Sequence, residues 1–127
     1  MKRWHVPSIE AVGQREPRVL FSTPECRAVV IDLRAGDELG DHSVRERAVL
    51  QVVSGAVSVS IGAGDETCGA GTVVAFDPGE RHSVRAAEDT RVLLLLAPWP
   101  GPGHYADGEA VDPQRVPANA SVPPISG

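Results

Sequence analysis

The chain is poor in cysteine and in aromatic residues, and both shortages exclude classes of protein. Its 127 residues include two cysteines, Cys26 and Cys68, and only 4% are aromatic. Two cysteines outside a C-x-x-C pair provide neither a disulfide framework nor a redox motif. We expect two small thiols in a reducing compartment, and a single bridge between them stays open as the alternative.

Long apolar runs and basic clusters are also missing. The longest apolar run, Val92 to Ala97, ends at Pro98 and is too short for a membrane-spanning helix. The segment from Met1 to Glu10 has no apolar stretch of the kind found in a secretory signal. The net charge is −5, and lysine is almost absent. We therefore expect a cytoplasmic protein that binds neither nucleic acid nor membranes.

The body of the chain offers no convincing amphipathic helix, whereas strand patterns recur throughout it. Alternation of apolar residues with serine over 57–61 predicts a strand with one buried face. Similar apolar runs occupy 28–33, 48–53, 72–76 and 92–96, and turns rich in Gly, Asp and Pro separate them. The chain length predicts one domain, and six to eight short antiparallel strands predict an all-β barrel or sandwich.

Proline is concentrated at the C-terminal end, where 98–127 hold seven of the eleven prolines. Proline cannot donate to a strand ladder or continue a helix. We therefore divide the chain into a barrel with an N-terminal arm, 1–97, and a Pro-rich tail docked on the barrel, 98–127. Trp99 and Tyr105 predict that the tail docks at its start, because aromatic side chains bury a large apolar area. Little apolar surface remains in 118–127, which predicts a loose end.

Two segments carry spaced glycines and histidines that resemble the two motifs of the cupin family, G-x5-H-x-H-x3-E-x6-G and G-x5-P-x-G-x2-H-x3-N. The first is matched at Gly36, His42 and Gly55, and the second at Gly71, Gly79 and His82. The resemblance spans roughly residues 18–97. It implies a cupin double-stranded β-helix, that is, a jelly-roll barrel, of the small single-domain bacterial kind.

The departures from these motifs fall on the family's metal ligands. In the family, both histidines and the glutamate of the first motif hold a metal ion together with the histidine of the second. Here Val44 stands in place of the second histidine and Ala48 in place of the glutamate. In the second motif, Asp77 and Ala86 replace the proline and the asparagine. The losses favour a degenerate pocket over a fully protein-coordinated metal.

Strand parity gives an independent prediction of the pocket. Alternate residues of a strand share a face, and the face that begins at His42 continues through mostly apolar residues, whereas the opposite face carries arginines. His82 likewise shares a face with two apolar residues. We predict that the two histidines point into an apolar lumen from different strands. The predicted pocket residues are His42, Val44, Glu46, Ala48, Leu50 and His82.

A metal site usually needs three or more protein ligands. His42 and His82 supply two, and either Glu46 or His104 in the tail is the candidate third. The resemblance implies Fe, Mn, Ni or Zn as the ion. The favoured alternative is a metal-free pocket in which both histidines are hydrogen-bonded.

Three functions follow from these observations. The favoured one is a small-molecule-binding protein with a degenerate two-histidine pocket and an unidentified ligand. The second is a metal-dependent cupin enzyme of the dioxygenase, isomerase or decarboxylase type. The third is a structural dimer module without a site. This function is disfavoured, because burying histidines that have no partner is unfavourable in free energy. The sequence leaves open whether the protein is an enzyme.

We also expect a homodimer, which the resemblance implies. Both faces of 28–33 and of 92–96 are apolar. One lumen buries a single face of each strand, so we predict that a second copy covers some of the other face.

Overall fold

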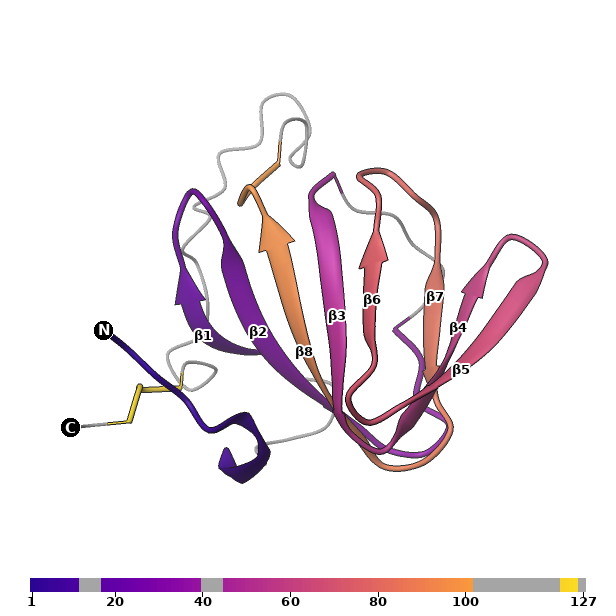
Figure 1. Ribbon diagram of the computed structural model, residues 1–127, viewed down its shortest axis with the longest axis horizontal. Coiled ribbons are helices and arrows are strands. Elements are labelled where there is room, and N and C mark those ends of the chain that lie inside the picture. Colours follow the sequence, from indigo (N-terminus) through magenta and orange to yellow (C-terminus); the bar gives the residue numbers. More distant parts are fainter. Residues whose placement is uncertain (12–16, 40–44, 102–121, 126–127) are drawn as a thin grey trace.

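The structure, a computed structural model, describes residues 1–11, 17–39, 45–101 and 122–125 (Figure 1). Within these residues it contains a 3-10 helix of three residues, η1 (Val6–Ser8), and eight strands. The strands are β1 (Arg18–Ser22), β2 (Arg27–Leu33), β3 (Arg47–Ser54), β4 (Ala56–Ile61), β5 (Gly64–Gly69), β6 (Val73–Phe76), β7 (Ser83–Ala86) and β8 (Thr90–Ala97). In the described part of the chain, no helix has the length and apolar character needed to cross a membrane.

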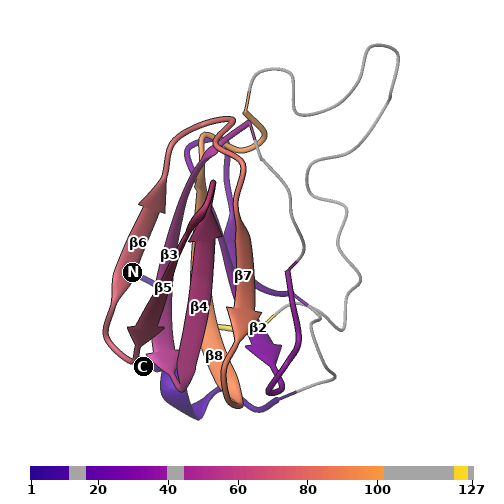
Figure 2. The same ribbon diagram turned by 90° about the vertical axis from the view of Figure 1, so that its right-hand side faces the viewer.

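The strands form two antiparallel sheets that pack face to face (Figure 2). One sheet has five strands in the order β1-β2-β8-β3-β6, and the other has three in the order β5-β4-β7. Beside β7 runs the segment 36–39, where Leu39 donates its N–H to the Val84 carbonyl and Ala86 donates to the Asp37 carbonyl, each at 2.8 Å. The all-β jelly-roll barrel predicted from the sequence is confirmed.

The core lies between the sheets and follows the predicted alternation. Along β3, Ala48, Leu50 and Val52 are buried, whereas Arg47 and Gln51 are exposed. The facing sheet contributes inward residues of β4, β5 and β7, namely Val57, Val59, Cys68, Val84 and Ala86. Strand period and apolar pattern therefore agree, and together they place the inner face of each strand.

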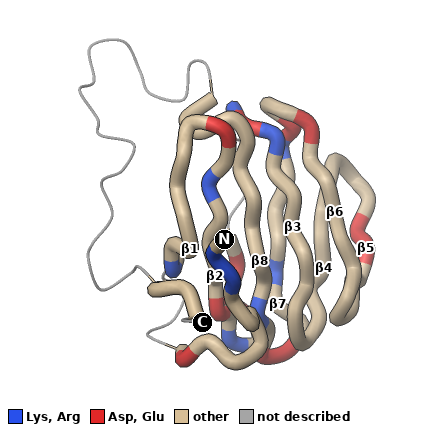
Figure 3. Tube along the Cα trace, turned by 60° about the vertical axis from the view of Figure 1, so that its left-hand side comes forward, with Lys and Arg blue, Asp and Glu red and all other residues tan. Residues whose placement is uncertain are grey.

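The outer face of β2 is covered by the chain itself. Ala28 and Val30 lie outside the core cluster yet are almost fully buried. An N-terminal arm, residues 1–11, crosses this side of the large sheet (Figure 3). Its Trp4 stacks on Phe21, the cross-strand neighbour of Ala28. The argument that a second copy must cover this face of β2 is therefore wrong for Ala28 and Val30.

The tail is attached at both of its described ends. At its start, Trp99 packs against the core, donates its N–H to the Pro24 carbonyl at 3.1 Å, and lies under the Arg27 guanidinium. Near its end, Val122 donates its N–H to the Val19 carbonyl at 2.9 Å, and Ile125 donates to the Arg3 carbonyl at 2.8 Å. The prediction of a loose end is wrong for 122–125, because backbone hydrogen bonds there need no apolar side chains. Tyr105 and His104 lie outside the described residues.

Candidate functional site

His82 is held in one orientation at the end of the barrel where β3 and β7 begin, which is the top in Figure 1. The residue is 5% exposed, and its ring stacks on Phe76 of β6, with ring centroids 3.7 Å apart and planes at 5°. The Nδ1 atom lies 3.0 Å from the Glu80 carbonyl oxygen. A carbonyl only accepts, so Nδ1 carries the proton, and in a neutral ring the lone pair is on Nε2.

A cavity of about 330 Å³ reaches His82 from the rim of the smaller sheet. It is lined by Ser60, Gly62, Arg81, His82 and Ser83. Ser60 and Ser83 are cross-strand partners of β4 and β7, and the Ser60 hydroxyl donates to the Asp65 carboxylate. The residues that line it therefore include two serines, an arginine and a histidine, which suits a small polar ligand.

Glu46 is buried in the same end of the barrel, but its carboxylate holds the tail. The side chain is fully buried, and Oε2 accepts a hydrogen bond from the Gly101 N–H at 2.6 Å. Gly101 fits closely here, because a Cβ on it would lie 3.1 Å from backbone atoms of Arg45 and Glu46. The sequence suggested Glu46 as a third metal ligand, and the structure gives one of its oxygens a different partner.

The other predicted pocket residues divide into two groups. Ala48 and Leu50 are buried on the inner face of β3, and Ala48 is the cross-strand neighbour of Phe76, on which His82 stacks. Ala48, Leu50 and Phe76 all belong to the hydrophobic core. His42, Val44 and His104 lie outside the described residues, so their predicted approach to His82 stays a prediction.

The described side chains do not by themselves fit a metal ion. No group of three or more His, Cys, Asp or Glu side chains comes together in 1–11, 17–39, 45–101 and 122–125. At the end of the barrel that contains His82, the candidate ligands among the described residues are His82 and Glu46. One carboxylate oxygen of Glu46 already accepts a hydrogen bond from the Gly101 N–H. A protein site for a transition metal would need further ligands from the remaining residues.

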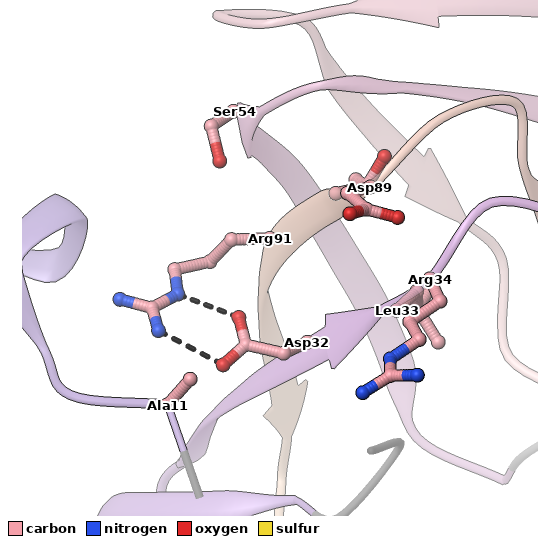
Figure 4. A pocket seen from close by; sticks show the side chains of 8 residues that line it. Ala11, Asp32, Leu33, Arg34, Ser54, Asp89 and Arg91 are labelled. Carbon is pink, nitrogen blue, oxygen red and sulfur yellow. Dashed lines mark hydrogen bonds and ion pairs between the residues drawn. The ribbon is translucent and has the colours of Figure 1, made fainter. Parts of the chain in front are cut away.

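A larger cavity, about 670 Å³, lies elsewhere, beside the N-terminal arm (Figure 4). At its centre Arg91 of β8 forms two hydrogen bonds with Asp32 of β2, from Nε at 2.7 Å and from Nη2 at 2.8 Å. Nη1 donates to the carbonyls of Val6 and Ile9 in the arm. The hydrogen bond with Asp32 raises the pKa of Arg91, with a smaller opposing effect of burial. These contacts give Arg91 a structural role in holding the arm, so size alone does not mark this cavity as the site.

Sequence reasoning missed four residues around His82. Arg81 and Ser83 flank it in the chain, and their position next to a motif histidine was an available signal. Phe76 ends an apolar strand, but its stacking depends on how the turn 77–82 brings the ring of His82 back over β6. Ser60 is brought in by the pairing of β4 with β7, which local sequence does not specify.

Comparison with known proteins supports the barrel geometry. A family model described as a cupin domain matches residues 29–98. No curated protein matches the chain. An RmlC-like cupin from Desulfovibrio desulfuricans has a similar structure, with a TM-score of 0.70 and 22% identity over 77% of this chain and 97% of that one.

Two further solved structures are similar. A conserved protein of unknown function from Streptococcus pyogenes is 25% identical over 64% of this chain and 71% of that one, with a TM-score of 0.59. KdgF from a Halomonas species is 23% identical over 65% of this chain and 78% of that one, with a TM-score of 0.62. At these identities the structural likenesses support the fold and do not transfer a substrate.

Proposed function

The chain belongs to the cupin domain family, and from this premise we propose that it binds a small polar molecule at the His82 end of its barrel. One observation carries the proposal: His82, a buried residue with an oriented ring, lines a cavity together with an arginine and two serines. A ring held by Phe76 and the Glu80 carbonyl needs little reordering when a ligand binds.

The chemistry of the lining favours an anionic ligand that also carries hydroxyl groups. The Arg81 guanidinium at the cavity attracts a carboxylate, and charge-assisted hydrogen bonds are the stronger kind. The Ser83 hydroxyl can donate or accept, and the Ser60 hydroxyl, which donates to Asp65, can still accept. The cavity volume, about 330 Å³, is at the small end of ligand pockets, so we propose a small hydroxy acid as the ligand class.

Binding of a panel of small hydroxy acids, measured by calorimetry, tests this function. Replacement of His82 by Ala should weaken binding of the best ligand by about tenfold or more, since it removes a hydrogen bond to a charged ligand. Arg85→Ala is the control, because Arg85 is exposed on β7 and does not line the cavity. Equal affinity of His82→Ala and wild type across the panel would refute the assignment.

Cupins often bind metals, and the same variants test a metal-dependent version of the site. Protein purified without a histidine tag is analysed for Fe, Mn, Ni and Zn. A stoichiometric metal that His82→Ala loses and Arg85→Ala retains would support a metal-dependent cupin, with further ligands outside the described residues. Ligand binding that survives treatment with a chelator would support the metal-free pocket.

A further inference from the structure

A third cavity opens between the two sheets at the edge where β5 and β6 lie. It has a volume of about 290 Å³ and is lined by Val59, Ile61, Gly64, Glu66, Cys68 and Val74. We call these six residues the β5–β6 slot. β5 is the outermost strand of the small sheet and β6 is the outermost strand of the large one. The slot is therefore an opening into the core from the side of the barrel, formed by different residues from those around His82.

The lining residues of β5 all point toward the core. Cys68 pairs with Val57, and Glu66 pairs with Val59, across the β4–β5 ladder. Directly paired residues share a face of the sheet, and Val57, Val59 and Cys68 are buried in the core. Glu66 is thus a solvent-exposed carboxylate on the side of β5 that faces the core, beside the apolar residues of the slot.

No charge compensates this carboxylate within the described structure. Among the described residues, no hydrogen bond or ion pair holds the Glu66 carboxylate, and no Lys or Arg lines the slot. The slot therefore combines apolar walls with one exposed carboxylate, that of Glu66. Such a site is complementary to an organic cation.

We propose that the β5–β6 slot binds a small organic ammonium ion with a short apolar chain. The chain lies against Val59, Cys68 and Val74, and the ammonium group donates to the Glu66 carboxylate. The volume of about 290 Å³ limits the occupant to a small molecule. This site is independent of the function proposed for the His82 end.

A competing explanation is that Glu66 protects an edge strand. Inward-pointing charges on edge strands prevent pairing with other chains. In that case replacement of Glu66 by a neutral residue promotes association of the protein and changes no ligand affinity. The two explanations predict different measurements on the same variant.

Titration of the full chain with n-hexylammonium, followed by amide chemical shifts in NMR, is the first test. We expect shifts concentrated on the slot residues, and tighter binding of hexylammonium than of hexanol or hexanoate. Glu66→Gln should weaken binding of hexylammonium by about tenfold, the effect of losing one charge-assisted hydrogen bond. Glu88→Gln, an exposed glutamate outside the slot, is the control with the same change of charge.

Filling the slot is the second test. Gly64 has no positive φ, and the only atom within 4 Å of a Cβ built there is the Ile61 carbonyl oxygen at 3.7 Å. Gly64 shares the inward face, so Gly64→Leu should fold and occupy the slot. It should abolish the binding of hexylammonium, whereas Thr67→Leu on the other face of β5 should leave it intact.

Cys68 supplies an independent readout, because its thiol lines the slot and is only slightly exposed. In a Cys26→Ser background, hexylammonium should slow the alkylation of Cys68 by iodoacetamide at least fivefold at saturation. The proposal is overturned if hexanol and hexylammonium bind equally, if Glu66→Gln retains full affinity, or if Gly64→Leu still binds. Self-association of Glu66→Gln with unchanged affinity would establish edge protection instead.

Discussion

Gly55 illustrates how a single residue position is constrained by both backbone conformation and close approach. It lies in the turn between β3 and β4 with φ of 84°. A Cβ there would lie 2.3 Å from the Asp89 carbonyl oxygen and 2.5 Å from Thr90 Oγ1. Thr90 Oγ1 also accepts from the Ala56 N–H at 3.1 Å. The glycine therefore allows the β7–β8 turn to pack against the β3–β4 turn.

Gly55→Ala should be more destabilising than the same change at a glycine with equal backbone strain. Gly71 has φ of 91°, and nothing lies within 4 Å of a Cβ built there. We expect Gly71→Ala to lower the free energy of unfolding by about 1 kcal/mol, from strain alone. Gly55→Ala should lower it by about 3 kcal/mol, because backbone atoms must also move. Urea denaturation measures both, and equal losses would contradict the steric argument.

At the scale of elements, Arg91 connects β2, β8 and the N-terminal arm. Its side chain is 9% exposed and that of Asp32 is 21% exposed, whereas the pair formed by Arg47 and Asp77 is 49% and 75% exposed. A pair shielded from water resists screening, and breaking it leaves polar groups without partners. The pair formed by Arg91 and Asp32 should therefore contribute to the free energy of unfolding, whereas the pair formed by Arg47 and Asp77 should not.

Replacement of Arg91 by Leu should release the arm and lower the free energy of unfolding by about 2 kcal/mol. Arg47→Leu should change it by less than about 0.5 kcal/mol. The raised pKa of Arg91 means that its contribution is complete below the ordinary arginine pKa and is lost only as the pH rises through the higher folded value. The loss in Arg91→Leu should thus be the same across roughly pH 6 to 9.

Chemical denaturation at about pH 6 and about pH 9 measures the free energies of unfolding of wild type, Arg91→Leu and Arg47→Leu. Limited proteolysis, with cleavage sites mapped by mass spectrometry, reports separately on the arm. Faster cleavage within 1–11 is expected only in Arg91→Leu. Protection of the arm that equals wild type would show that Trp4 and its stacking on Phe21 hold the arm without Arg91.

At the scale of the whole molecule, the homodimer remains a prediction, and fewer exposed apolar residues now support it. The arm covers Ala28 and Val30, but other apolar residues on the outer side of the large sheet remain partly open. Leu93 and Leu95 are half-buried, and Val73 is 59% exposed. We expect any dimer interface on this sheet to lie toward β3, β6 and β8.

Replacement of Val73 by Asp should dissociate such a dimer, because it places a charge in an apolar contact. Light scattering at micromolar concentration should give a dimer for wild type and for Thr67→Asp, an exposed control on the smaller sheet, and a monomer for Val73→Asp. A monomeric wild type would refute the dimer, and a dimeric Val73→Asp would place the interface on another face.

The sequence by itself determined the fold and the inward face of its strands. Motif glycines and dense turn chemistry predicted a cupin barrel, and the alternation along 46–52 assigned Ala48 and Leu50 to the interior, where they are buried. These inferences succeed because strand period and turn conformation are local properties, which neighbouring residues set.

Only the tertiary structure decided which residues surround His82 and what Glu46 and Arg91 do. Glu46 accepts from Gly101, 55 positions away in the chain, and Arg91 binds carbonyls more than 80 positions away. The cavity beside His82 brings in Ser60 through the pairing of β4 with β7. Such contacts depend on how distant segments meet once the sheets have packed, so no local pattern of the sequence specifies them.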